Sequence, residues 1–224
     1  VITRDEALPY LEDGAVLLDG EAVREVGPLA ELKAKYPGTE FVDAKGGVIM
    51  PGLINVHTHI YSGLARGLSI DGFNPTNFFE VLDGQWWYID RHLTLDGTRA
   101  SAYATVLDCI RDGVTTIFDH HASFCEIPGS LFAIQDVCRE LGIRANLCYE
   151  VSERDGEEKC RQAIRENADF ARWAKEQDDD MIKAMFGGHA LFTISDKTFE
   201  EMVKANDGMT GFHIHVAEGM NDVY

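Results

Sequence analysis

The segment that decides the fold runs from Val48 to His59 and reads Val-Ile-Met-Pro-Gly-Leu-Ile-Asn-Val-His-Thr-His. Its apolar residues predict a strand over Gly47–Val56, and two histidines separated by one residue follow this strand. Residues i and i+2 of an extended chain point to the same side, so His57 and His59 can present two imidazoles to one ion. Imidazole is a common ligand for zinc and other divalent metals.

Downstream of this segment, short apolar runs alternate with helical patterns whose apolar residues lie three and four positions apart. Alternation of this kind predicts a parallel sheet with right-handed crossovers, in which the carboxyl ends of all strands meet at one rim. The further strands are predicted at Val114–Asp119, Ile143–Tyr149, Ile182–Gly188 and Gly211–Val216, and the helices at Thr98–Asp112, Leu131–Leu141, Glu157–Lys175 and Lys197–Ala205.

Ionisable residues stand at the end of every predicted strand. Polar residues also mark the point where any strand reaches the surface, but a histidine or an acid on all five strands favours a shared site. In a βα barrel the carboxyl-end rim carries the chemistry. The residues at these ends are Asp119, His120 and His121 for the second strand, Glu150 for the third, His189 for the fourth and His215 for the fifth.

A second His-x-His pair, His213 and His215, is followed by Val-Ala-Glu218. The chain is expected to leave the strand here, which brings Glu218 beside whatever His215 binds. A metal-activated water needs a nearby base, and Glu218 supplies one without being a ligand. Glu218 would also suit the N-terminus of a helix, where the helix dipole favours a carboxylate. We interpret His213 as a buried, hydrogen-bonded histidine.

Two units are predicted, over residues 1–45 and 46–224. The first contains the apolar run Gly14–Gly20, a hairpin partner at Glu21–Val26 and a short helix at Leu29–Tyr36. So small a unit has little core of its own, and we expect other parts of the chain to complete it. In the second unit, the long connection over 61–97 contains Phe78, Phe79, Trp86 and Trp87, which predict a helical cap over the mouth of the sheet.

Composition excludes several classes of partner. The 224 residues include 20 Lys and Arg against 38 Asp and Glu, a net charge of −18, which argues against nucleic acid and anionic membrane surfaces. No stretch approaches the roughly 20 apolar residues that cross a bilayer. The five cysteines are scattered with no Cys-x-x-Cys pair, as is typical of free thiols in the reducing cytoplasm.

The segment that ends in His-Thr-His resembles the first-strand signature of the amidohydrolase superfamily. It is most similar to the branch that contains cytosine and guanine deaminases, chlorohydrolases and triazine hydrolases. Further similarity to this branch lies in Ala65–Leu68, Gly188–Ala190 and His213–Glu218. Within the branch, the runs Ser69–Pro75, Gly84–Trp87 and Phe118–Phe124 are most similar to the SsnA group of aminohydrolases.

The resemblance implies a (β/α)₈ TIM barrel beside a small β-sandwich built from both chain termini, with residues 1–45 as the N-terminal part of that sandwich. It implies one divalent metal ion, Zn or Fe, held by His57, His59 and His215. Glu218 would be the catalytic proton shuttle, and His189 would contact the substrate and assist catalysis. Further candidates for substrate contact are Asp90, Trp86, Trp87 and His120.

The family's complete site also includes a histidine after strand six and an aspartate after strand eight. This sequence reaches Tyr224 just past the fifth predicted strand. We therefore expect a partial barrel of strands one to five, truncated before strands six to eight and inactive by itself. An exposed parallel edge and uncovered apolar surface are expected to make such a fragment poorly soluble.

The implied activity is that of a metal-dependent aminohydrolase. Activated water would attack a C–N bond of a heterocyclic or amidine-like small molecule and release ammonia, in an enzyme expected to be a homodimer. One alternative is hydrolytic dechlorination at the same site. Another, of a different class, is a non-catalytic fragment with a binding or assembly role.

Overall fold

The computed structural model describes residues 1–220, and the chain divides between Gly52 and Leu53 into two compact units. The sequence placed this division slightly earlier, between residues 45 and 46. No helix in the described part of the chain is long and apolar enough to cross a membrane. The five cysteines all lie among the described residues, and none of them forms a disulfide.

The first unit is a small antiparallel hairpin followed by a helix. Strand β1 (Gly14–Asp19) pairs with β2 (Ala22–Pro28), and α1 (Leu29–Lys35) begins directly after Pro28. The predicted hairpin and helix are thus confirmed. Leu32 is the one buried apolar side chain of this unit, so the hairpin has almost no core of its own. Its membership of a composite β-sandwich stays a prediction.

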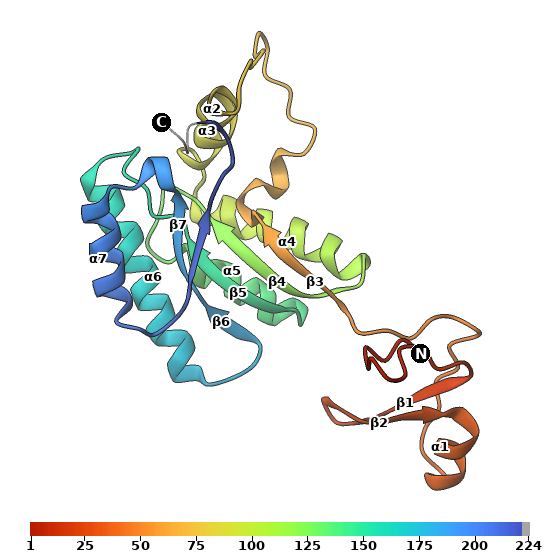
Figure 1. The fold of residues 1–224 in the computed structure, drawn as a ribbon. Coiled ribbons are helices and arrows are strands. Elements are labelled where there is room, and N and C mark those ends of the chain that lie inside the picture. The colour runs from red at the N-terminus through yellow and green to blue at the C-terminus, as the bar shows by residue number, and fades with distance from the viewer. Residues whose placement is uncertain (221–224) are drawn as a thin grey trace. The chain divides into compact units, whose positions relative to one another are not determined.

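The second unit is built on parallel strands in chain order (Figure 1). Four strands form one sheet, β3-β4-β5-β6, and two more form the parallel pair β7-β8. The N–H of Met185 donates to the carbonyl of Leu147 at 3.1 Å, which joins the pair to β5. The strands are β3 (Leu53–Thr58), β4 (Val114–His121), β5 (Arg144–Tyr149), β6 (Ile182–Ala184), β7 (Phe186–Ala190) and β8 (Phe212–His215).

The single strand predicted over Ile182–Gly188 is interrupted at Met185, and beyond this point the backbone of β7 closely approaches that of β5. A Cβ atom at Gly187 would lie 2.3 Å from the carbonyl oxygen of Tyr149, so only glycine fits there. The side chain of Asn167 bridges the two strands. Its Oδ1 accepts from the N–H groups of Tyr149 at 2.9 Å and Gly187 at 3.1 Å, and its Nδ2 donates to the Tyr149 carbonyl at 2.8 Å.

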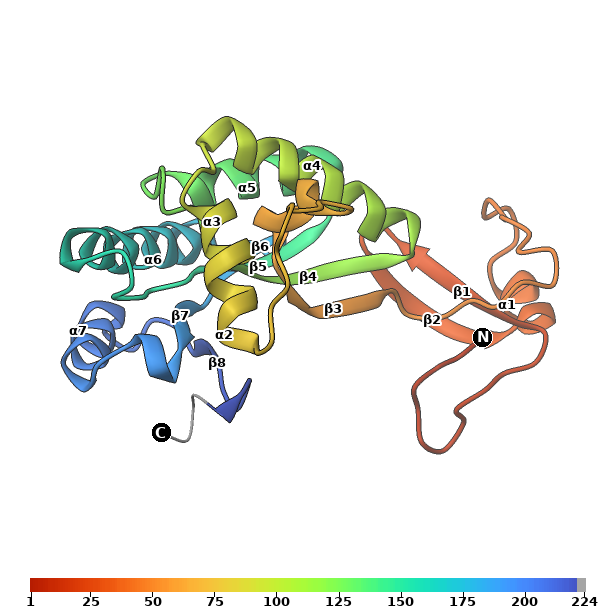
Figure 2. The same ribbon diagram turned by 90° about the horizontal axis from the view of Figure 1, so that it is seen from above.

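Four helices lie along one side of the sheet, and the apolar core is packed between them and the strands (Figure 2). Side-chain caps fix two of their starts: Thr94 accepts from the N–H of Gly97, and Ser195 from that of Thr198. All four helices were predicted within a few residues. They are α4 (Leu95–Arg111), α5 (Ser130–Leu141), α6 (Glu157–Gln177) and α7 (Asp196–Asn206).

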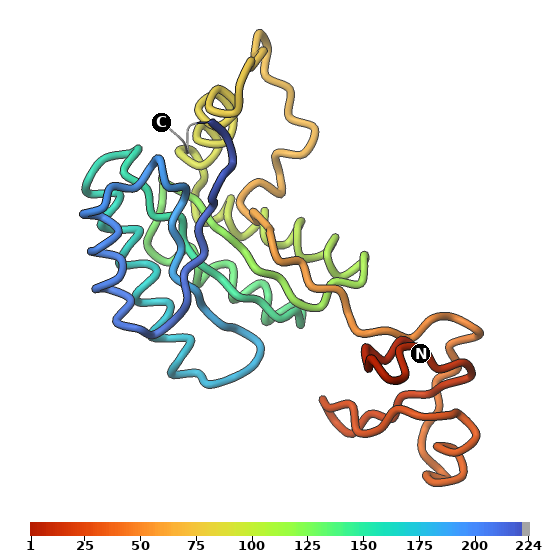
Figure 3. Tube along the Cα trace, viewed as in Figure 1, coloured from red at the N-terminus to blue at the C-terminus, as the bar shows by residue number. Residues whose placement is uncertain are grey.

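The long connection after β3 contains short helices, as predicted, separated by the irregular residues 66–77, and the trace in Figure 3 leaves β3 and returns toward the ends of the strands. Ring centroids of Trp87 and His189 are 6.0 Å apart, so the end of this cap covers the end of β7. Its elements are the 3₁₀ helix η1 (Ile60–Ala65), α2 (Phe78–Val81), the π-helical turn η2 (Leu82–Trp86) and α3 (Trp87–Asp90), and a further 3₁₀ turn is η3 (Leu191–Thr193).

Replacement of Asn167 by alanine is expected to destabilise the full-length protein by about 2–4 kcal/mol. The change leaves buried backbone groups of Tyr149 and Gly187 without the amide that satisfies them. Urea unfolding measures the loss. Gln162→Ala on the same helix, where the amide donates to Glu158 at the surface, is the control and should cost less than about 0.5 kcal/mol. Equal effects of the two changes would contradict this account.

Candidate metal centre

Three imidazoles meet at the carboxyl ends of the two outermost strands. The Nε2 atom of His57 lies 3.0 Å from Nε2 of His59 and 3.2 Å from Nε2 of His215. His57 and His59 stand at the end of β3, and His215 ends β8. Because β6 and β7 are two parts of one interrupted strand, β8 lies four places from β3. In a flat sheet, strands four places apart would be separated by about 19 Å. The sheet must therefore curve as a barrel wall does to bring these side chains together.

Backbone carbonyls orient two of the three rings. Nδ1 of His59 lies 2.9 Å from the carbonyl oxygen of His120, and Nδ1 of His215 lies 3.0 Å from that of His189. A carbonyl oxygen only accepts, so each Nδ1 carries the hydrogen and donates it. The opposite nitrogen, Nε2, then directs its lone pair toward the other rings. This is the tautomer that a metal-binding histidine adopts.

The donor set fits one divalent metal ion. Zinc binds imidazole nitrogen at about 2.0–2.1 Å in a tetrahedron, which places two ligand nitrogens about 3.3 Å apart. The Nε2 distances from His57 to His59 and from His57 to His215 are close to this value, and all three atoms lie within 4.8 Å of one another. The ligand set expected from the sequence is therefore brought together.

The three rings differ in their affinity for protons. Burial lowers the pKa of His215 to about 3 and also lowers the pKa of His57. Burial acts in the same direction on His59, but the hydrogen bond and the negative charge of Glu150 outweigh it and raise the pKa to about 9. A proton on His59 and a metal ion therefore compete for the same nitrogen.

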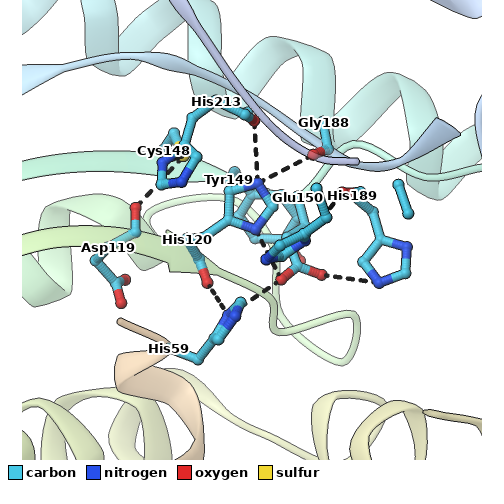
Figure 4. Close-up of polar contacts among 12 residues, drawn as sticks. His59, Asp119, His120, Cys148, Tyr149, Glu150, Gly188, His189 and His213 are labelled. Atoms are coloured by element: carbon cyan, nitrogen blue, oxygen red, sulfur yellow. Dashed lines mark hydrogen bonds and ion pairs between the residues drawn. The ribbon is translucent and has the colours of Figure 1, made fainter. Parts of the chain in front are cut away.

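A buried network lies behind the three rings (Figure 4). Oε1 of Glu150 is 3.0 Å from Nδ1 of His120 and 3.4 Å from Nδ1 of His59. The sequence placed Glu150 at a strand end but gave it no role. It proposed His120 as a substrate contact, but both ring nitrogens of His120 already face protein oxygens and its side chain is fully buried. A contact of His120 with substrate stays a prediction.

His189 lies at the rim, where the sequence placed it. Its Nδ1 is 3.0 Å from Oγ1 of Thr193, and that hydroxyl donates to the Ala190 carbonyl at 2.9 Å. Because the Thr193 hydroxyl uses its one hydrogen for the Ala190 carbonyl, it accepts a hydrogen bond from Nδ1 of His189. In the neutral ring Nε2 is then unprotonated and can accept a hydrogen bond. Burial lowers the pKa of His189 to about 4, which keeps the ring neutral. Trp87 and Phe192 flank this ring.

Asp90 and the two cap tryptophans, Trp86 and Trp87, were predicted as substrate contacts. Asp90 is fully buried and its Oδ2 lies 2.5 Å from a guanidinium nitrogen of Arg154. Burial raises the pKa of Asp90 to about 7, although Arg154 acts to lower it. Trp87 is buried, with the Arg154 guanidinium 5.0 Å from its ring centre, and Trp86 is half-buried. Their contact with substrate stays a prediction.

Asp119, which the sequence placed at the end of the second strand without a role, lies beside these residues. It is fully buried on β4, and its Oδ1 accepts from the backbone N–H of Ile60 at 2.6 Å. This bond fixes the chain directly after His59. Burial raises the pKa of Asp119 to about 7. Its position at the end of an apolar strand was the only available signal.

Beyond β8 the chain turns out of the strand as expected, with Ala217 in the left-handed region at φ 60°. Glu218 follows and is half-buried, and a Cβ atom on the next residue, Gly219, would meet Phe78 of the cap at 3.9 Å. This part of the chain therefore lies near α2. His213, expected to be buried, is half-buried, and its Nδ1 lies 3.7 Å from Sγ of Cys148 rather than at the three converging imidazoles.

Comparison with known proteins identifies the family. The amidohydrolase family profile matches residues 48–224, and the chain belongs to this family. A profile for the bacterial imidazolonepropionase-like composite domain matches residues 14–38. The expected membership of the superfamily and of its deaminase and chlorohydrolase branch is confirmed. The similarity to the SsnA group stays a prediction.

Curated relatives are deaminases. A 5'-deoxyadenosine deaminase of Methanosarcina mazei is 31% identical over 220 residues, which are 97% of this chain and 47% of the relative. A 5-methylthioadenosine/S-adenosylhomocysteine deaminase of Thermococcus onnurineus is 31% identical over 183 residues, 81% of this chain and 41% of the relative. The chain thus spans about half the length of the curated relatives that it matches.

Solved structures share the fold. An adenosine deaminase of Xanthomonas campestris with bound zinc aligns over 92% of this chain and 45% of its own, with 22% identity and a TM-score of 0.73. Atrazine chlorohydrolase TrzN of Arthrobacter aurescens, in a mutant form with zinc and atraton, aligns over 98% and 51% with 22% identity and a TM-score of 0.79. The predicted partial TIM barrel is therefore confirmed.

Metal binding is expected to release about one proton at about pH 7.5, because His59 carries a proton below its raised pKa of about 9 and must lose it from Nε2. The affinity should rise about tenfold per pH unit up to that pKa and then level off. Calorimetry in buffers of different ionisation enthalpy counts the proton. An affinity that does not change between about pH 7 and about pH 8.5 would contradict the assignment.

Proposed function

We propose that this chain carries the metal-binding part of an aminohydrolase that removes an amino group from a heterocyclic small molecule as ammonia. The observation that carries the proposal is the convergence of the Nε2 atoms of His57, His59 and His215 within 3.0–3.2 Å of their neighbours. Three imidazoles, once His59 has lost its proton, are the protein ligands of a hydrolytic zinc site, which keeps a position for water, rather than of a closed structural one.

The relatives support a purine nucleoside, or a similar heterocycle with an exocyclic amino group, as the substrate. Those that are 31% identical to this chain are named for deamination of 5'-deoxyadenosine and 5-methylthioadenosine. The aromatic rings of Trp87 and Phe192 beside His189 would suit a flat ring system. Asp90, Trp86 and His120 remain candidate substrate contacts.

Different side chains have different roles in the proposed reaction. A divalent cation bound by the three imidazoles supplies a Lewis acid that lowers the pKa of water near neutrality. Glu218 takes the proton from the attacking water and delivers it to the departing nitrogen, since ammonia leaves only with an added proton. Neutral His189 accepts a hydrogen bond at Nε2 and so orients an amino N–H of the substrate.

We further propose zinc as the metal, a cytoplasmic location and a homodimeric assembly. The three imidazole nitrogens favour zinc over harder cations. The five free cysteines agree with a reducing compartment. Dechlorination of a triazine-like substrate is the second candidate, but the likeness to the chlorohydrolase concerns the fold, whereas the relatives above 30% identity are deaminases.

Glu218→Gln in the zinc-loaded, full-length protein is expected to lower the rate of ammonia release about 10²- to 10⁴-fold while the metal content persists. The amide keeps the size of the side chain but cannot carry the proton. Ammonia release from a panel of aminopurine nucleosides, aminopurines and aminopyrimidines provides the assay, with chloride release from chlorotriazines measured in parallel.

Glu201→Gln, an exposed carboxylate on α7, is the matched control and should leave the rate unchanged. Near wild-type ammonia release by the Glu218 variant would remove this residue from the mechanism. Chloride release without ammonia release would replace deamination by dechlorination. A full-length protein that binds no metal would contradict the proposal and favour a binding or assembly role.

A further inference from the structure

One buried carboxylate connects three of the strands that build the site. Glu150 follows β5, the central strand, and only 2% of its surface is exposed. Its Oε1 lies 3.0 Å from Nδ1 of His120 on β4 and 3.4 Å from Nδ1 of His59 beyond β3. Its Oε2 lies 3.8 Å from Nε2 of His189 on β7 (Figure 4). A charge so deeply buried is retained only where such partners surround it.

His120 extends these connections to the last two strands. Its Nε2 lies 3.0 Å from the carbonyl oxygen of Gly188 on β7 and 3.1 Å from that of His213 on β8. Gly188 directly precedes His189, and His213 stands two residues before the ligand His215. Both carbonyl oxygens only accept, so this ring nitrogen donates to them. The orientation of the His120 ring therefore fixes the backbone beside both residues.

We propose that Glu150 and His120 are positioning residues that hold the metal ligands His59 and His215 in the geometry for one ion, an inference that rests on the proposed metal centre. Glu150 orients the His59 ring from behind, together with the carbonyl of His120. His120 fixes β8 and, through it, His215. In this role neither residue touches the metal.

The same residues offer a rival arrangement, a second metal ion. His59, His120 and Glu150 each present a ligand atom, and these atoms lie within 4.8 Å of one another. The hydrogen bonds favour positioning, because Nδ1 of His59 is already 2.9 Å from the His120 carbonyl and Nε2 of His120 is already bound to two carbonyls. Metal stoichiometry separates the two arrangements.

The test is Glu150→Gln in the full-length protein, with the zinc dissociation constant measured by competition with a chromogenic chelator. Loss of a hydrogen-bonding partner behind a ligand typically weakens metal binding 10- to 100-fold, and we expect a loss of this size above about pH 9, where no proton competes with the metal for His59 in either protein. The wild type should bind one zinc ion. Cobalt substitution should show an altered visible spectrum in the variant, because the His59 ring shifts within the ligand set.

Glu166→Gln is the matched control. Glu166 is likewise buried at 5% exposure, but its carboxylate accepts from the backbone N–H groups of Gly129 and Leu131, away from the metal ligands. This change should leave the zinc dissociation constant within about twofold of the wild type. If Glu150→Gln does not fold, Glu150→Asp withdraws the carboxylate from His59 and His120 and carries the same expectation.

The outcomes are distinguishable. An unchanged dissociation constant and cobalt spectrum in the Glu150 variant, with loss of metal in His57→Ala, would overturn the positioning role and leave the proposed metal centre intact. Two zinc ions in the wild type, one of which is lost from Glu150→Gln, would overturn it in favour of a second site. Absence of metal from the wild type would overturn both the metal centre and this inference.

Discussion

The meeting of imidazole nitrogens from β3 and β8 is the constraint on which the rest of the molecule depends. These strands are the outer members of the parallel array, yet Nε2 of His57 and Nε2 of His215 are 3.2 Å apart. Only a curved sheet permits this contact, and helices packed along one side leave the strand ends free to converge. The cap after β3 then places Trp87 beside His189 at the same rim.

Buried carboxylates fix the segments around this meeting point. Asp119 binds the backbone N–H of Ile60, Glu150 lies behind His59, and Asp90 pairs with Arg154 under the cap. Each carries a desolvation cost that hydrogen bonds offset. Together they hold loops that would otherwise leave the rim without a defined geometry. These hydrogen-bonded carboxylates orient the segments that carry the candidate metal ligands, which is a common feature of metal sites.

Local sequence patterns were sufficient to predict the helices, the strands and the candidate metal ligands. Two features involve only residues that are close together in the sequence, and both can therefore be read from it directly. They are the spacing of His57 and His59 and the periodicity of the helices. The close approach of Gly187 to the Tyr149 carbonyl joins residues far apart in the chain, and buried Asp90 pairs with Arg154, more than sixty residues away. Glu150 stood at a strand end in the sequence, but its three imidazole neighbours come together only in the folded chain.

X-ray absorption spectroscopy of the zinc-loaded, full-length protein tests the central claim most directly. The account predicts three imidazole ligands at about 2.0–2.1 Å, with no sulfur ligand. The imidazole contribution should fall by one in His215→Ala. A spectrum with sulfur ligands, or with fewer than three imidazoles in the wild type, would contradict the convergence of the two strands on one ion.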